Sequence, residues 1–236
     1  MSPTLTIAQD PHADAVLSED PFALVMGMLL DQQFPMERAF AGPAALLARF
    51  GTLDPVAIAA ADPGEFADLA ATPPAIHRYA RSMAGRIQSL AATVLEDYDG
   101  VAERIWTTTD DPQELLRRLE ALPGFGAQKA RIFAALLGKQ LGVRPAGWRE
   151  TIGPYAEEGS FRSVADVVDA DSLLKVRAFK QQAKQAAKAA AAEAARAASA
   201  TPARPRPQRR SPRHRAAGSP THERRRRQGS GLPLCR

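Results

Sequence analysis

The chain has 236 residues, is 45% hydrophobic but only 6% aromatic, and carries a formal net charge of +5. This length suits one domain or two small ones, and the single cysteine, Cys235, excludes an internal disulfide, a four-thiolate zinc site and an iron–sulfur cluster. The charge is uneven, because residues 201–236 hold eleven arginines and one glutamate and residues 1–200 therefore carry a net charge of −5. Any polyanion bound by the folded part must meet a local basic patch.

Helix signals recur through the first 200 residues. Asp20, Asp54, Asp62 and Asp111 each precede a proline, which places a capping side chain before a residue suited to the first helical position. Apolar residues follow at helical spacing, and no alternating β-branched runs occur. The pattern predicts an all-α fold with helices over residues 21–33, 35–41, 43–50, 55–61, 63–71, 74–98, 112–121, 127–141 and 172–198.

The two ends of this helical region differ in character. The run Phe22–Leu30 is apolar nearly all round, which predicts a helix through the middle of the fold; it is far shorter than the ~20 residues that span a bilayer. The last helix turns into an Ala/Lys/Gln repeat that is expected to project or fray. We expect a domain over residues 1–160, a helical segment over 161–199 and a disordered Arg/Pro-rich tail over 200–236. Without a signal-peptide pattern, the expected location is the cytoplasm, or the nucleoid in a bacterium.

The segment 112–142 is the most informative part of the sequence. One predicted helix ends in the turn Leu122-Pro123-Gly124-Phe125-Gly126, and the next begins at Ala127. The two glycines permit a tight turn, and the free N–H groups of the second helix suit a phosphate. From Ala121 to Arg149 there are five basic residues, including Lys129 and Arg131, and no acid. These features indicate a DNA-binding hairpin; the alternative is an ordinary helical corner with solvated basic residues.

The hairpin LPGFGAQKA resembles the helix-hairpin-helix of the HhH-GPD superfamily of base-excision DNA glycosylases. Phe22–Gln33 is similar to the family's apolar helix and its Gln-containing turn, and Ile76–Leu95 to the helix before the hairpin. The resemblance implies two helical lobes around a pocket, base flipping and cleavage of the N-glycosidic bond. By register, the resemblance implies that Gln33, with Gln32 next to it, fills the hole in the base stack; the alternative is that the pair is merely a polar helix end. The DNA contacts implied or expected are Gln32, Gln33, Leu122, Gly124, Phe125, Gly126, Gln128, Lys129 and Arg131.

The hairpin departs from the pattern of relatives that also nick the strand. Their lysine nucleophile falls at Gln128 in this sequence, and Lys129 comes one residue later. One residue turns a side chain by about 100° around a helix. We therefore expect Lys129 to face a phosphate rather than the pocket, and we expect no lyase activity.

The family aspartate that follows the hairpin is also missing. Its register lands near Ala146, in a stretch without any carboxylate. Asp31 and Glu150 are the candidate catalytic acids, although Asp31 also suits a helix cap and Glu150 an ion pair with a neighbouring arginine. Trp148 and Tyr155 are candidates for stacking on a flipped base, or else core residues.

These features predict a monofunctional DNA glycosylase that acts as a monomer on damaged double-stranded DNA. The first alternative is a catalytically inactive protein that binds damaged DNA on the same scaffold. The second is nonspecific nucleic-acid binding dominated by the arginine-rich tail, which predicts steep salt dependence. No metal or iron–sulfur cofactor is expected, apart from a monovalent cation between the hairpin and a phosphate. The segment His77-Arg78-Tyr79 is a further candidate for DNA contact.

Overall fold

The computed structural model of the chain describes residues 4–200. Residues 201–236, almost the whole of the expected disordered tail, lie outside this range. The chain divides into two units, Met1–Ala192 and Glu193–Arg236, and the architecture below is that of the first. Its helices are, in chain order, α1 (Pro11–Glu19), α2 (Pro21–Leu30), α3 (Met36–Phe50), α4 (Pro55–Ala60), α5 (Pro63–Ala71), α6 (Ala80–Tyr98), α7 (Arg104–Thr107), α8 (Pro112–Ala121), α9 (Ala127–Gln140), α10 (Trp148–Ile152), the 3-10 helices η1 (Gly153–Ala156) and η2 (Val164–Asp166), and α11 (Ala170–Ala200), which runs beyond the unit.

The predicted all-α fold is confirmed, since residues 4–200 contain helices and turns but no strand. Aspartate caps start five of the helices. The side chains of Asp10, Asp20, Asp54, Asp62 and Asp111 each accept a backbone N–H of the following turn, and a proline occupies the start of each helix. A cap of this kind stabilises a helix by about 1 kcal/mol.

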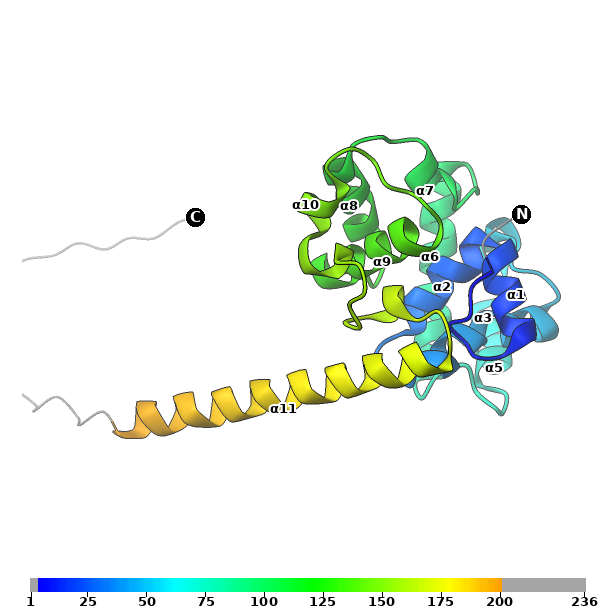
Figure 1. Cartoon of the computed structure of the whole chain (residues 1–236). Helices are drawn as coiled ribbons and strands as arrows, with labels where there is room; N and C mark the ends of the chain where they lie inside the picture. The colour runs from blue at the N-terminus through cyan, green and yellow to red at the C-terminus, as the bar shows by residue number, and fades with distance from the viewer. Residues whose placement is uncertain (1–3, 201–236) are drawn as a thin grey trace, which may run out of the picture. The chain divides into compact units, whose positions relative to one another are not determined.

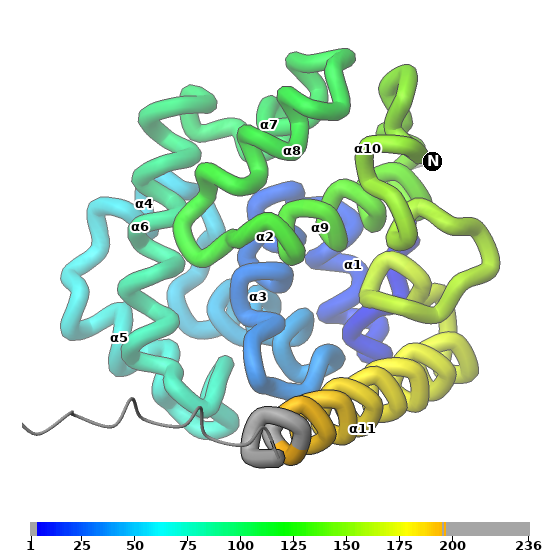
Figure 2. The backbone as a smooth tube through the Cα atoms, turned by 90° about the vertical axis from the view of Figure 1, so that its left-hand side faces the viewer, coloured from blue at the N-terminus to red at the C-terminus, as the bar shows by residue number. Residues whose placement is uncertain are grey.

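Helix α2 lies at the centre of the fold (Figures 1 and 2). Every residue from Phe22 to Leu30 is buried, as its uniform apolar character predicts. The helix packs against α1, α3 and α6, and Gly27 allows the Phe40 ring to approach so closely that a Cβ there would lie 2.7 Å from it. No helix within residues 4–200 combines the length and apolar character that crossing a bilayer requires.

The remaining helices pack around this centre in two groups. Helices α4 and α5 pack on α6, while α8 and α9 form the hairpin, against which α10, η1 and η2 lie. A buried ion pair between Lys139 of α9 and Asp166 of η2 joins the last of these. The amide of Gln140 adds a hydrogen bond to the Ala165 carbonyl at 3.0 Å. The segment after residue 160 therefore packs on the hairpin within the first unit.

The helix limits differ from the predicted ones in a few places. The predicted helices over 35–41 and 43–50 form the single helix α3, which continues through Pro43. Helix α6 begins at Ala80 rather than at residue 74. Helices α1, α7 and α10 were not predicted, although Asp10-Pro11 carries the same start signal as the four helices that were.

Candidate functional site

The turn between α8 and α9 is built from two buried anchors and two glycines. Leu122 and Phe125 are buried, and the Phe125 ring meets Phe133 edge-on at 6.0 Å between centroids. Gly124 has φ of +79°, a left-handed conformation that favours glycine; a Cβ there would also collide with the side chain of Leu29. Gly126 begins α9 without a side-chain cap. The first N–H groups of α9 are thus left for water or a ligand, with the helix dipole favouring an anion.

A cleft of about 720 Å³ lies between this turn and the end of α2. The end of α2 and the loop after it form one wall, the start of α9 forms the other, and Lys180 of α11 lies at the edge. The lining residues are Met28, Asp31, Gln32, Gln33, Phe34, Gly124, Gly126, Ala127, Gln128, Lys129, Ile132 and Lys180. The structure therefore brings together two predicted motifs that lie about ninety residues apart in the sequence.

Lys129 joins the two walls of this cleft. Its Nζ donates to the carbonyls of Met28 at 2.6 Å and Leu29 at 3.1 Å, at the C-terminal end of α2. Burial lowers the pKa of Lys129 from 10.5 to about 8, against the opposing effect of the nearby Asp31 charge. The side chain was expected to face a phosphate away from the pocket, and this expectation is corrected. Its ammonium group instead donates to carbonyls at the C-terminal end of α2, where a helix dipole favours a cation.

The Gln turn is held by contacts from both sides. The Gln32 amide donates to the Leu29 carbonyl at 2.7 Å and accepts from Arg86 at 3.2 Å. His77 Nδ1 accepts the Tyr79 backbone N–H at 3.0 Å, so its Nε2 donates to the Gln32 carbonyl at 2.9 Å. These contacts fix the backbone just before Gln33.

Gln33 is exposed and has φ of +51°, a left-handed conformation that a non-glycine residue adopts at a cost of about 1–2 kcal/mol. It lines the cleft and also a second hollow of about 240 Å³, on the side of His77, Tyr79 and Arg86. Its side chain therefore stands between two hollows. This strained and exposed position is suited to a residue that inserts into a ligand.

The two candidate acids occupy different places. Asp31 caps the end of α2, is half-buried and lines the cleft beside Lys129. Glu150 is exposed on α10 and is not part of the cleft lining. The cleft geometry therefore favours Asp31.

The two candidate aromatic residues also differ. Trp148 is only 2% exposed, donates its indole N–H to the Ala134 carbonyl at 3.0 Å and packs against Gly138. The prediction that it stacks on a base is corrected, because it is a core residue. Tyr155 is half-buried, and its hydroxyl accepts the Gln128 amide at 3.0 Å, so it adjoins a cleft residue without lining the cleft itself.

The remaining predicted contacts lie around the hairpin. Arg131 is exposed on the side of α9 away from the cleft, in a groove shared with Arg117 and Glu120. His77 is buried, and its contact is with the Gln turn. The sequence motifs gave no indication of Arg86 and Lys180, which the fold brings to the site from α6 and α11.

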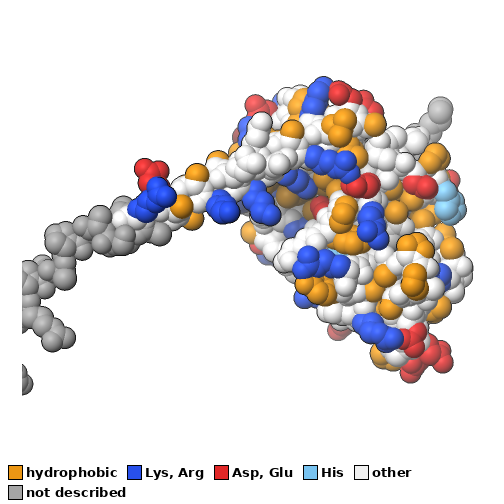
Figure 3. Space-filling model, turned by 90° about the horizontal axis from the view of Figure 1, so that it is seen from below, with side chains coloured by type: hydrophobic (Ala, Val, Ile, Leu, Met, Phe, Trp, Pro, Cys, Tyr) orange, Lys and Arg blue, Asp and Glu red, His pale blue; other side chains and the backbone are white. Residues whose placement is uncertain are grey.

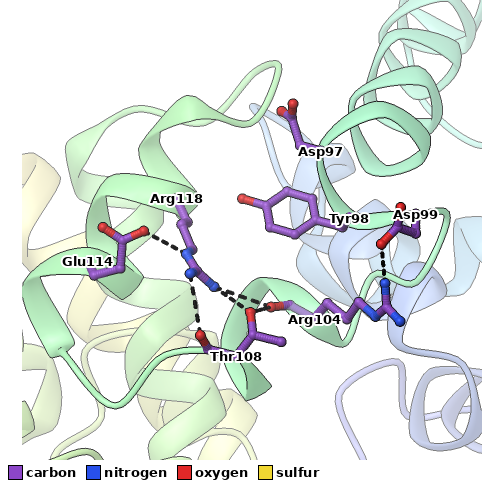
Figure 4. Close-up of a pocket in the computed structure, with 7 residues that line it drawn as sticks. All are labelled: Asp97, Tyr98, Asp99, Arg104, Thr108, Glu114 and Arg118. Carbon is purple, nitrogen blue, oxygen red and sulfur yellow. Dashed lines mark hydrogen bonds and ion pairs between the residues drawn. The ribbon is translucent and has the colours of Figure 1, made fainter.

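A separate hollow of about 520 Å³ lies between the end of α6, α7 and α8 (Figure 4). Arg118 donates to Glu114 and to the Thr108 hydroxyl, both at 2.7 Å, and Arg104 pairs with Asp99. Both arginines are thus already neutralised within the hollow. We therefore place the functional site in the cleft at the hairpin. Among residues 4–200, no cluster of three or more His, Cys, Asp or Glu side chains is placed to hold a metal ion.

Comparison with protein families agrees with this geometry. The family model described as HhH-GPD superfamily base excision DNA repair protein matches residues 26–198, which include the end of α2, the hairpin and most of α11. The chain belongs to this superfamily. Neither curated proteins nor solved structures gave a match.

Proposed function

We propose that this member of the HhH-GPD superfamily is a monofunctional DNA N-glycosylase, which flips a damaged nucleotide from a duplex into the cleft and hydrolyses its glycosidic bond. The observation that carries the proposal is the cleft itself. It joins an anion-binding hairpin, an exposed strained glutamine and a carboxylate within one space.

Each wall of the cleft has a separate task in this proposal. The open N–H groups at the start of α9 bind a phosphate of the strand that carries the lesion. Gln33 enters the base stack in place of the flipped nucleotide, since it is exposed and its backbone is held by His77 and Gln32. The volume of about 720 Å³ falls within the range of small-molecule pockets, enough for one nucleobase.

Asp31 is the proposed catalytic carboxylate. Loss of the base leaves positive charge on the sugar, and an ionised carboxylate close to it stabilises that transition state or activates water. The C-terminal end of α2 carries partial negative charge beside Asp31, which the Lys129 ammonium offsets in the free protein. The chain thus offers negative charge from the α2 side, although no carboxylate lies between Ala121 and Arg149 after the hairpin.

The absence of lyase activity is part of the proposal. Gln128 occupies the register of the family's nucleophilic lysine, and its amide is bonded to the Tyr155 hydroxyl. The Nζ of Lys129 donates to two carbonyls at the end of α2, and attack on a sugar would require it to leave both. The reaction uses water as its nucleophile and needs no metal cofactor.

A second function has one observation in its favour. The register of the family's aspartate lands near Ala146, in a stretch without any carboxylate, which favours a protein that binds damaged DNA without cutting the glycosidic bond.

The test offers the full chain duplexes that contain uracil, hypoxanthine, an oxidised purine or an alkylated purine. Strand breaks that appear only after alkali are the expected result. Asp31→Asn should lower the rate by at least about 100-fold, while the matched variant Glu150→Gln should retain it. Breaks without alkali would refute the monofunctional assignment. Intact strands together with tight binding to abasic DNA would establish the second function instead.

A further inference from the structure

Helix α11 contacts the rest of its unit through its first ten residues, the last of which, Phe179, packs under the Arg162 guanidinium. Leu173 and Val176 are buried, and Arg177 forms an ion pair with Glu37 of α3. After Val176, every residue up to Ala192 is exposed. This part of the helix therefore owes its stability to its alanine-rich composition and leaves its side chains free for another molecule.

Three lysines form a stripe along this exposed part. Lys180, Lys184 and Lys188 are spaced four residues apart, so that successive side chains lie about 40° apart around the helix and about 6 Å apart along it. No acidic residue occurs between Lys180 and Ala192. Figure 3 shows Lys and Arg side chains along α11 and on the adjoining face of the body.

The stripe lacks the neutralising contacts that other lysines of this region have. Lys175, two residues before Arg177, pairs with Asp171 at 2.6 Å and lies over the Phe161 ring at 4.9 Å. No such contact links Lys180, Lys184 or Lys188 to another residue of the described part of the chain. Like charges four residues apart destabilise a helix by about 0.2–0.5 kcal/mol per pair. An anionic ligand along this face relieves that repulsion.

The stripe begins at the functional site, because Lys180 also lines the cleft together with Asp31, Gln33 and Lys129. A duplex engaged by the cleft therefore has phosphates within reach of Lys180. The next two lysines continue away from the cleft along α11.

We propose that Lys180, Lys184 and Lys188 form a second binding surface for the phosphate backbone of duplex DNA, extending the contact beyond the nucleotide held in the cleft. This inference rests on the proposed function, since it takes the cleft to be the place where the duplex is bound. A DNA strand presents one phosphate per about 3.4 Å of helix axis, so lysines about 6 Å apart on long flexible stems each find one. Contacts of this kind recognise the charge and spacing of the phosphates, so the surface has no preference for DNA sequence.

The test measures binding of the full chain to a fluorescent duplex with a stable abasic-site analogue, across a range of salt concentrations. Each lysine–phosphate contact contributes about −0.9 to the slope of log K against log salt concentration. Lys184→Ala should therefore make the slope less steep by about 0.9, and the triple alanine variant by about 2.7. Between 50 and 200 mM salt, the advantage of the wild type over the triple variant should shrink by roughly 40-fold.

Lys175→Ala is the matched control, because it removes one lysine from the same helix but from outside the stripe. Alanine preserves the helix, which circular dichroism can verify for each variant. Residues 201–236 are present in all the proteins compared. The proposal that the stripe binds DNA would be refuted if wild type and the triple variant gave equal slopes. It would also be refuted if Lys184→Ala and Lys175→Ala had equal effects. Either result would leave the proposed function intact. Failure of the wild type to bind any duplex would instead overturn the proposed function.

Discussion

Replacing Lys129 by methionine should change how the stability of the protein depends on pH. In the folded protein, burial lowers the pKa of Lys129 to about 8, whereas the unfolded chain has the ordinary value of 10.5. Between these two pH values the unfolded state binds more protons than the folded state, so the free energy of unfolding rises with pH. Above pH 10.5 the amine is neutral in both states and the folded protein keeps its full stability. As the pH falls from 10.5 through 8, that stability is lost because the unfolded chain takes up the proton more readily.

The size of the effect follows from the two pKa values. At pH 7, the difference in pKa lowers the free energy of unfolding by about 3 kcal/mol, compared with a pH at which Lys129 is neutral in both states. Between pH 7 and pH 10, the stability of the wild type should rise by about 2.5 kcal/mol relative to Lys129→Met, which has no group to titrate. The other ionisable groups contribute equally to the pH dependence of both proteins, so their contributions cancel in the difference.

Urea unfolding followed by tryptophan fluorescence and circular dichroism, at half-unit steps from pH 7 to pH 10, gives both stability curves. Lys184→Met removes the same charge from an exposed position on α11 and is the control; its curve should run parallel to that of the wild type. A difference between wild type and Lys129→Met that stays constant within about 0.5 kcal/mol would show that the amine is solvated, and would refute its place at the end of α2.

Three further substitutions test other parts of the fold by the same unfolding assay. Lys139→Met leaves the Asp166 carboxylate buried without its partner and should cost about 3–5 kcal/mol; a loss below 1 kcal/mol would mean that water reaches the pair. Gly138→Ala places a Cβ against the Trp148 indole and should cost roughly 1–3 kcal/mol, whereas Gly85→Ala, at a position with open space, should be neutral or stabilising. Asp20→Ala removes the cap of α2 and should cost about 1 kcal/mol; because burial raises the Asp20 pKa, the cost should be smaller at neutral pH than at pH 4, and the opposite trend would contradict that burial.

Local sequence signals were sufficient for most of the helices. A helix start depends on a cap and a proline that are adjacent in sequence, which is why Asp54 and Asp111 marked α4 and α8 correctly. The sequence predicted one helix ending at residue 41 and another beginning at Pro43, a residue suited to the first helical position. Helix α3 instead continues through Pro43; Gly42 and Pro43 are buried, and Gly42 lies against Leu30 of α2. Tertiary packing of this kind is not visible in a local pattern.

The same distinction applies to the site. The hairpin and the Gln turn are continuous motifs, so both were found from the sequence. The direction of the Lys129 side chain depends on the position of α2, about a hundred residues earlier. Register alone predicted that the side chain faces a phosphate rather than the pocket, whereas in the structure it donates to the carbonyls of Met28 and Leu29. Lys180 likewise lines the cleft only because the chain before it packs on α9 through η2 and on α3 through Arg177.

The cleft joins two helix ends of opposite polarity, and this arrangement bears on the proposed chemistry. The N-terminal end of α9 favours an anion, and the C-terminal end of α2, followed by Asp31, favours a cation. In the free protein the Lys129 ammonium satisfies the second preference. A sugar that gains positive charge beside Asp31, with its phosphate on α9, matches both preferences at once. In the proposed mechanism, Asp31 at the end of α2 takes the place of the carboxylate after the hairpin, which makes Asp31→Asn the substitution that separates a glycosylase from a binding protein.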